Sequence, residues 1–237
     1  ANKQVTSQIN QPVGTQSFFG SLDYTYNDKY ILRATVRRDG SSVFYPGHQW
    51  GTFPSLSAAW RISQEDFLKS VSWINDMKIR ASWGEAGFAG NTPGTNPYSL
   101  YGGSPGNGYY PIAGAGVTQQ GFYLSNLGNT HTTWENDKGL DIGLDASLFN
   151  HFELTVDWYR KTIGGLFVCT SVPGTLGGAT PPVINLGNVS NNGVDVAIDY
   201  RNNIGNDIKY HVGVNVTAYK NKILTMPNNY QDDAGNR

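Results

Sequence analysis

The residues best suited to chemistry in this sequence are the aromatic side chains of one glycine-rich segment, residues 85–138. Long segments that lack a helix or strand of their own are usually binding loops or lids. Tyr and Phe rings can stack on the face of a sugar or on a peptide side chain. We therefore expect ligand contacts from Tyr98, Tyr101, Tyr109, Tyr110, Phe122 and Tyr123. Packing of these rings against the loop itself is the alternative interpretation.

Residues that could support catalysis or metal binding form no recognisable pattern. The four histidines are far apart in sequence and match no zinc motif. The sequence contains no nucleophile elbow, phosphate-binding loop or dinucleotide fingerprint. Cys169 is the single cysteine, which excludes an internal disulfide, and we expect it to be a small packing residue. The sequence thus predicts no enzyme, no metal site and no cofactor.

The elements that must position the aromatic segment are eight stretches in which apolar and polar residues alternate. A period of two is typical of β-strands, whose successive side chains point to opposite faces. The positions assigned to the apolar face carry no charge. These stretches cover residues 18–26, 30–36, 50–62, 77–83, 140–148, 152–158, 194–200 and 208–218.

The other face of these strands carries charges of both signs. Alternation alone fits a soluble sandwich as well as a barrel whose apolar face contacts lipid. The acids on the polar face could line a solute path, but pairing with basic residues on neighbouring strands is the interpretation we favour. The acids are Asp141, Asp145, Asp157, Asp195 and Asp199, and the bases are Arg33, Arg37, Arg61, Lys78 and Arg80.

Aromatic residues of the apolar face gather at the two ends of the strands. Because Tyr and Trp combine an apolar body with a polar tip, they settle where hydrocarbon meets lipid headgroups. Two aromatic belts separated by aliphatic residues are typical of outer-membrane barrels. One belt comprises Tyr26, Tyr30, Trp60, Phe152, Tyr200 and Tyr210, and the other Phe18, Trp50, Trp83 and Trp158.

Connection lengths alternate between short and long, as a barrel with one periplasmic and one extracellular end requires. The sequence therefore predicts an all-β, antiparallel transmembrane β-barrel with extracellular loops at 85–138 and 161–192. Within the short connections, Ser63-Gln64-Glu65-Asp66 resembles a capping box and predicts a small periplasmic helix. Pro54 lacks a donor for the strand ladder and predicts a bulge or a break in pairing.

Composition is consistent with this class. Charged residues make up 15% of the chain, below the roughly 25% of soluble domains. A net charge of −1 offers no electrostatic basis for binding nucleic acid. An open sheet edge cannot face lipid, because each unpaired backbone group would cost several kcal/mol. We therefore expect further strands from a longer protein.

Several strings in this order resemble the SusC/RagA family of TonB-linked outer-membrane transporters. They are residues 30–42 (YILRATVRRDGSS), 50–63 (WGTFPSLSAAWRIS), 78–84 (KIRASWG), the pair Trp134-Glu135, 157–162 (DWYRKT) and 185–195 (NLGNVSNNGVD). The matches run in family order from about Ser17 to Tyr219. Nearly the whole chain is thus covered by the resemblance.

The resemblance implies that residues 1–237 are a partial barrel domain, the C-terminal part of a plugged barrel of about 22 strands. It further implies a bacterial outer-membrane importer of oligosaccharides or oligopeptides. The implied partners are a SusD-like surface lipoprotein and TonB, the latter through a plug region that this sequence lacks. The alternative is a secreted or cell-surface β-sandwich that binds glycans, in which a second sheet covers the apolar face.

Overall fold

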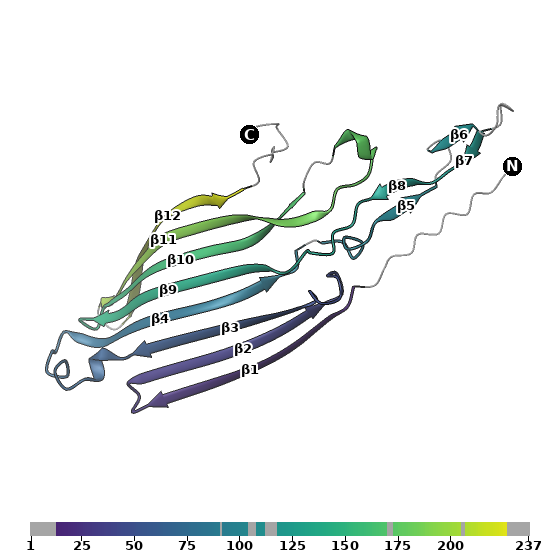
Figure 1. Cartoon of the computed structure of the whole chain (residues 1–237). Helices are drawn as coiled ribbons and strands as arrows, with labels where there is room; N and C mark the ends of the chain where they lie inside the picture. Colours follow the sequence, from purple (N-terminus) through teal and green to yellow (C-terminus); the bar gives the residue numbers. More distant parts are fainter. Residues whose placement is uncertain are drawn as a thin grey trace.

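The long strands of the chain follow one another side by side in a single antiparallel sheet (Figure 1). The computed structural model describes residues 13–90, 92–103, 108–111, 118–169, 173–204 and 207–226. The sheet order is β1-β2-β3-β4-β9-β10-β11-β12, so each strand pairs with the next long strand along the chain. Their bounds are Thr15–Tyr26, Tyr30–Ser41, Trp50–Trp60, Ile74–Phe88, Glu135–Leu148, Phe152–Cys169, Val183–Ile204 and Ile208–Thr225. All eight predicted strands are confirmed.

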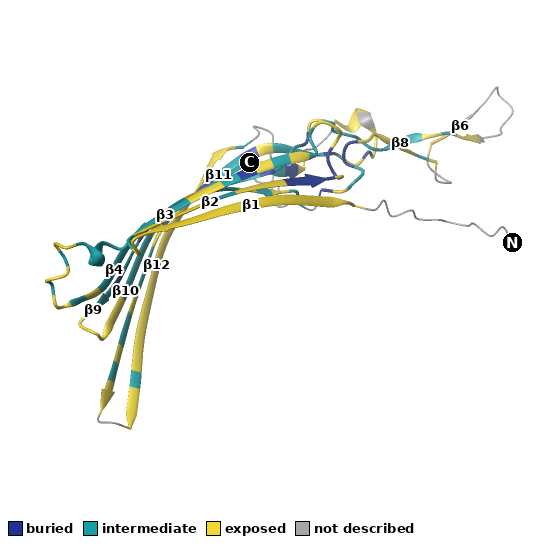
Figure 2. Ribbon diagram, turned by 90° about the horizontal axis from the view of Figure 1, so that it is seen from below, coloured by how far each residue is buried: buried dark blue, intermediate teal, exposed yellow. Residues whose placement is uncertain are grey.

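Most of the large side chains on the apolar face of this sheet are exposed. Leu22, Leu56 and Val214 have relative exposures of 68%, 50% and 57%. Within the described part of the chain, no second sheet packs against them, and Figure 2 shows one curved layer. In a soluble β-sandwich, a second sheet would cover these three side chains and remove them from water. The structure therefore does not support the β-sandwich alternative.

Both aromatic belts are present on the apolar face. At the end with short connections, Tyr30 stacks between Tyr26 and Trp60, with ring centroids 6.4 Å apart in both pairs. At the other end, Phe18 stacks on Trp50 at 6.1 Å.

The described residues contain no helix long and apolar enough to cross a membrane.

Two of the short connections are tight turns with left-handed backbone at both central residues. The φ angles are 51° and 54° at Asn27 and Asp28, and 54° and 58° at Phe149 and Asn150. Such turns match the twist of a hairpin. Phe149 is an unusual residue for this backbone, and its ring stacks on Trp73 at 5.6 Å.

Pro54 ends the pairing on one side of β3 only. Pro54 pairs with Val36 of β2 without a shift in register, whereas the β3–β4 ladder begins one residue later, at Ser55 opposite Gly84. The predicted break in pairing is therefore confirmed on the β4 side. Beyond it the two strands separate, and the Phe53 side chain is 7% exposed near this gap.

The predicted capping box does not form, and the single helical turn expected in this connection is a 3₁₀ turn. It is η1 (Ile62–Gln64), and no side chain caps it. The Glu65 carboxylate accepts hydrogen bonds from Lys29 Nζ at 2.9 Å, Tyr30 Oη at 2.8 Å and Trp60 Nε1 at 3.1 Å instead. The two residues of the expected box have other partners, because the Ser63 hydroxyl donates to Asp76 Oδ1 at 2.6 Å and the Asp66 carboxylate accepts from Lys69 Nζ at 2.8 Å.

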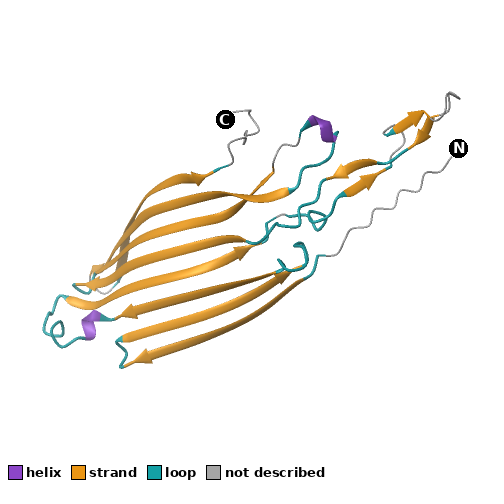
Figure 3. Cartoon of the chain, viewed as in Figure 1, coloured by secondary structure: helices purple, strands orange, loops and turns teal. Residues whose placement is uncertain are grey.

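The long connections contain regular structure that was not predicted. Strands β4 and β9 extend to Phe88 and from Glu135, so the β4–β9 connection spans only 89–134. Inside it β5 (Leu100–Gly102) pairs with β8 (Tyr123–Asn126), and β6 (Tyr109–Pro111) with β7 (Thr118–Gln120) (Figure 3). Strands of three or four residues are too short to show a period of two.

The β10–β11 connection is likewise shorter than the predicted 161–192. Strand β10 runs to Cys169 and β11 begins at Val183, and one 3₁₀ turn, η2 (Gly174–Leu176), lies between them. Cys169 is exposed at the last residue of β10, so the expectation that it packs internally is wrong.

Candidate functional site

The polar face of the sheet carries a network of ion pairs centred on Arg80 of β4. Its guanidinium contacts the carboxylates of Asp145 on β9 and Asp157 on β10, each at 2.7 Å. Lys78 also pairs with Asp145, at 3.1 Å. These side chains are about one-third exposed or less, so water screens the attraction only in part. The network ties three strands together and neutralises their charges.

Most other charges on this face are paired as well. Arg33 binds Asp23 on β1, Arg61 pairs with Asp76 and His211 with Asp199. Asp195 differs, because its buried Oδ1 atom has no hydrogen-bond partner among the described residues. Strand-to-strand pairing with the predicted bases is thus confirmed for Asp145 and Asp157 and, at 3.8 Å from Arg80, for Asp141. Asp199 contacts His211 instead of one of these bases, and the pairing is not confirmed for Asp195.

The end of the sheet with long connections holds the most buried part of the chain, shown dark blue in Figure 2. Phe44 is 1% exposed and packs on the Trp134 ring at 5.2 Å. Phe53 contacts the same Trp134 ring at 5.6 Å, edge to face. The Trp134 indole N–H donates to the Gln49 carbonyl at 3.1 Å. This aromatic cluster joins the 42–49 connection to the start of β9.

One buried amide, Asn96, and one half-buried amide, Asn185, fasten the same region to β11. Asn96 accepts from the Val183 backbone N–H at 2.8 Å and donates to Thr132 Oγ1 at 2.9 Å. Asn185 accepts from the Thr133 N–H at 2.8 Å and donates to the Thr133 carbonyl at 3.0 Å. The backbone groups of Val183 and Thr133 are thus bound by asparagine side chains and not by a neighbouring strand. The base of the long loop is therefore fixed to the sheet.

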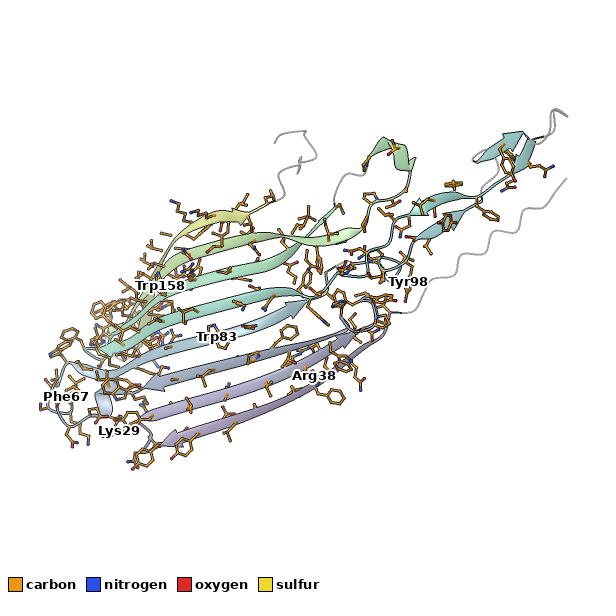
Figure 4. The ribbon with its side chains drawn as sticks, in the orientation of Figure 1. Lys29, Arg38, Phe67, Trp83, Tyr98 and Trp158 are labelled. Carbon is orange, nitrogen blue, oxygen red and sulfur yellow. The ribbon has the colours of Figure 1, made fainter. Side chains whose placement is uncertain are left out.

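The aromatic residues predicted to contact a ligand lie on a narrow two-stranded ribbon that extends from this base. The β5–β8 and β6–β7 pairs lie beyond the end of the sheet (Figure 1). Tyr98 lies at the base (Figure 4), with its ring 6.5 Å from the Tyr45 ring and inclined at 60° to it. Tyr101 and Phe122 are 70% and 81% exposed. The structure thus places the six predicted residues along the ribbon and does not gather them into one pocket.

Glycines make room for several of these rings. A Cβ at Gly102 would lie 2.9 Å from the Tyr123 ring, and one at Gly121 would lie 2.9 Å from the Tyr110 ring. Phe122 similarly covers Gly103. Tyr109 pairs with Gln120 across the ribbon and is 46% exposed. The rings therefore pack on the loop and still present surface to solvent, and their contact with a ligand stays a prediction.

Sequence reasoning missed the residues that hold the loop base. Asn96, Asn185, Thr132 and Phe44 were not singled out for this role. The one available signal is the apolar run Val43-Phe44-Tyr45 inside a connection that otherwise reads as polar. Asparagine pairing across 87 residues leaves no local pattern.

The short-connection end has an electrostatic site of its own around Glu65. The Lys29 ammonium, with the hydroxyl of Tyr30 and the indole of Trp60, lowers the pKa of Glu65 from 4.5 to about 2. The same contact raises the pKa of Lys29. Figure 4 places Lys29 at the opposite end of the sheet from Tyr98. This arrangement holds the η1 turn against the β1–β2 hairpin and offers no site for a ligand.

Comparison with known proteins identifies the fold and the family. The chain matches the family described as "TonB dependent receptor-like, beta-barrel" over residues 2–237. It is 34% identical over 212 residues to TonB-dependent receptor P3 of Formosa agariphila, covering 89% of this chain and 20% of that protein. It is 28% identical over 226 residues to TonB-dependent receptor SusC of Bacteroides thetaiotaomicron, covering 93% and 22%. The chain thus spans about a fifth of these relatives.

Solved structures agree with the fold. The RagAB peptide importer in its closed-closed state superposes with a TM-score of 0.77 at 23% identity, covering 90% of this chain and 22% of that one. The siderophore receptor PirA from Pseudomonas aeruginosa gives 0.56 at 16% identity, covering 90% and 35%.

These matches confirm the predicted segment of a transmembrane β-barrel, its resemblance to SusC and RagA and its place in the bacterial outer membrane. The apolar face therefore contacts lipid and the polar face lines the lumen. The placement of the long connections on the extracellular side and of the short ones on the periplasmic side stays a prediction from their lengths. The chain belongs to the TonB-dependent receptor-like β-barrel family.

Proposed function

We propose that this chain is a section of the barrel wall of a TonB-dependent importer that takes up nutrient oligomers, either glycans or peptides. SusC among the relatives and the RagAB peptide importer among the structures support this assignment. The observation that carries it is the combination of a lipid-facing sheet, an ion-paired lumen wall and a loop fixed at its base. Such a wall is built to stay rigid while other parts of the protein move.

The wall does no covalent chemistry in this proposal. Its paired carboxylates are held by Arg80 and Lys78 and are therefore poor general acids or bases. No group of three or more metal-ligating side chains converges within the described residues. TonB would act on a plug region in the full-length protein, and a SusD-like lipoprotein would deliver cargo at the extracellular loops.

The loop aromatics are the proposed cargo contacts. Exposed rings on a ribbon with an anchored base can stack on sugar faces or peptide side chains without a large ordering cost. Tyr101 and Phe122 present the most surface. Tyr98, Tyr109, Tyr110 and Tyr123 would supply the rest of the stacking surface.

Replacing Tyr101 and Phe122 with Ala in the full-length protein tests this role. Each stacking contact contributes about 0.5–1.5 kcal/mol, so we expect import or binding affinity to fall by roughly three- to tenfold per ring. The measurement is uptake of labelled oligosaccharide and oligopeptide mixtures by cells that also express the SusD-like lipoprotein.

Phe67→Ala is the matched control, since Phe67 is an exposed aromatic, 63% accessible, at the periplasmic end (Figure 4). It should leave uptake unchanged. Normal uptake by the Tyr101→Ala/Phe122→Ala variant, with outer-membrane levels equal to those of the control, would refute the role of the ribbon. Uptake of neither mixture by the unaltered protein would refute the importer assignment itself.

A further inference from the structure

The lipid-facing side of the sheet carries charged residues only at its extracellular end. Strand register places every side chain of the described long strands on one face or the other. On the apolar face these strands carry five basic residues and one acidic residue. They are Arg38, Lys138, Arg160, Lys220 and Lys222, with Glu85 as the acid. At the periplasmic end, the same face ends in Tyr, Trp and Phe.

Four of the basic residues form a patch on β9–β12, which we call the cationic patch: Lys138, Arg160, Lys220 and Lys222. Arg160 pairs with Asn192, and Asn192 pairs with Lys220, so two strand spacings, about 10 Å, separate Arg160 from Lys220. Lys222 lies two residues farther along the same face. The patch is therefore compact enough to be bridged by one lipid headgroup.

The height of the patch in the membrane follows from the same register. Below Arg160 and Lys220, the next row on this face is Trp158, Val194 and Ala218. Trp158 belongs to the extracellular aromatic belt, which marks the upper limit of the hydrocarbon. The cationic patch thus lies at the depth of the outer-leaflet headgroups.

The positive charge of the patch is mostly uncompensated. Arg160, Lys220 and Lys222 are exposed, and no carboxylate lies within 4 Å of them in the part of the chain that the structure describes. Lys138 pairs with Glu85 at 3.1 Å. The acids of the neighbouring lumen face point to the opposite side, where Arg80 and Lys78 bind two of them.

We propose that the cationic patch binds the phosphate groups of an anionic glycolipid in the outer leaflet. A guanidinium can hold phosphate through two parallel hydrogen bonds, and the ammonium groups add point charges. Basic clusters beside a membrane span attract anionic headgroups in this way. A lipid fits better than a protein because the patch continues directly into the hydrocarbon-facing surface. Arg38, 5.3 Å above the Trp50 ring, is the fifth basic residue at this end of the sheet and lies outside the patch.

The test compares two variants of the full-length transporter purified in detergent. Lys220→Gln/Lys222→Gln removes two charges from the patch. Lys161→Gln/Lys209→Gln removes two from the lumen face, and Lys161 is the sequence neighbour of Arg160. Native mass spectrometry would measure binding of diphosphorylated lipid A, of its dephosphorylated form and of phosphatidylglycerol.

We expect the patch variant to bind diphosphorylated lipid A about 25-fold more weakly, at about fivefold for each of the two charges. The lumen variant should bind it normally, and the dephosphorylated form should bind the unaltered protein weakly. Equal weakening in both variants, or unaltered binding in both, would overturn the proposal. Equal affinity for phosphatidylglycerol would overturn the assignment to a glycolipid. If the double variant fails to fold, Arg160→Gln against Lys209→Gln makes the same comparison.

Discussion

Arg80 and Asp157 lie on strands that do not pair with each other, yet their guanidinium and carboxylate groups are 2.7 Å apart. Gly143 of β9 lies between them, opposite Arg80 on one side and Asp157 on the other. A Cβ at residue 143 would overlap both the Asp157 carboxylate and the Arg80 guanidinium. The missing side chain is therefore what allows β4 and β10 to be joined across β9.

Gly143→Ala should break this contact. The methyl group displaces the ends of two side chains and leaves the backbone in place, so the barrel should still form. A hydrogen bond between charged groups contributes about 1.5–3 kcal/mol when buried, and partial exposure lowers the expected loss to about 1 kcal/mol. Urea unfolding of the full-length protein in lipid vesicles would measure it.

Gly139→Ala is the control for that measurement. Gly139 lies on the same strand and the same face, and a Cβ there meets nothing within 4 Å. Its replacement should be neutral or slightly stabilising, because alanine restricts the unfolded chain. An equal loss in both variants would show that the strand tolerates no side chain at either position, contrary to the role assigned to Gly143.

The Glu65 cluster gives a prediction about pH. The folded-state pKa of Glu65, about 2, lies below its ordinary value of 4.5. Its contribution to stability is therefore complete above about pH 4.5 and is lost as the pH falls toward about 2. Carboxyl NMR of ¹³C-glutamate-labelled protein should show Glu65 titrating near the lower value.

Lys29→Met should move that titration upward, because the Lys29 contact is the largest cause of the shift. The pKa should stay below 4.5, since Tyr30 and Trp60 still donate to the carboxylate. Lys69→Met is the matched control, because Lys69 binds Asp66 and not Glu65. A Glu65 titration that Lys69→Met shifts as much as Lys29→Met would contradict this account.

The sheet could be predicted from the sequence because every one of its strands has two different environments. Lipid on one side and water on the other impose a period of two over many residues, as in β12 from Ile208 to Ala218. The belts could be predicted for the same reason. The paired charges of the lumen were predictable as a class, whereas the Arg80–Asp157 pair depends on register and on Gly143.

The extracellular end could not be predicted in the same way. Its packing depends on contacts between distant residues, such as Asn96 with Val183 and Trp134 with Gln49. Strands β5 to β8 contain three or four residues each, too few for periodicity to identify. The capping box expected at Ser63–Asp66 fails for another reason, since the Ser63 side chain binds Asp76 and the Asp66 side chain binds Lys69.

Asn185→Ala should loosen the base of the long loop. The change leaves the Thr133 N–H without its acceptor and the Thr133 carbonyl without its donor. An unsatisfied buried group costs about 1–3 kcal/mol, and because Thr133 is only half-buried we expect the lower end, so that hydrogen exchange in residues 89–134 should accelerate by about fivefold or more. Asn215→Ala, at an exposed lumen-facing position of β12, should leave exchange in the loop unchanged. Identical exchange in both variants would mean that other contacts fix the loop.

Phe53→Ala should destabilise the extracellular end more than any other single change considered. Phe53 is 7% exposed and contacts the Trp134 ring. It fills the space beside residues 50–54, where β3 is not paired with β4. Truncating a buried Phe costs about 3–5 kcal/mol. The glycines at 51 and 87 would clash with the Phe53 ring if they carried side chains, so the surrounding backbone is shaped for this ring and cannot easily fill the cavity.

Phe19→Ala separates this effect from the general loss of an aromatic residue. Phe19 lies on the same lumen face of β1 and is 81% exposed, so its removal should change the unfolding free energy by less than about 0.5 kcal/mol. Unfolding midpoints in urea would compare the two. Equal midpoints would mean that the β3–β4 gap closes without Phe53, and the aromatic cluster would then not be what holds the loop base to the wall.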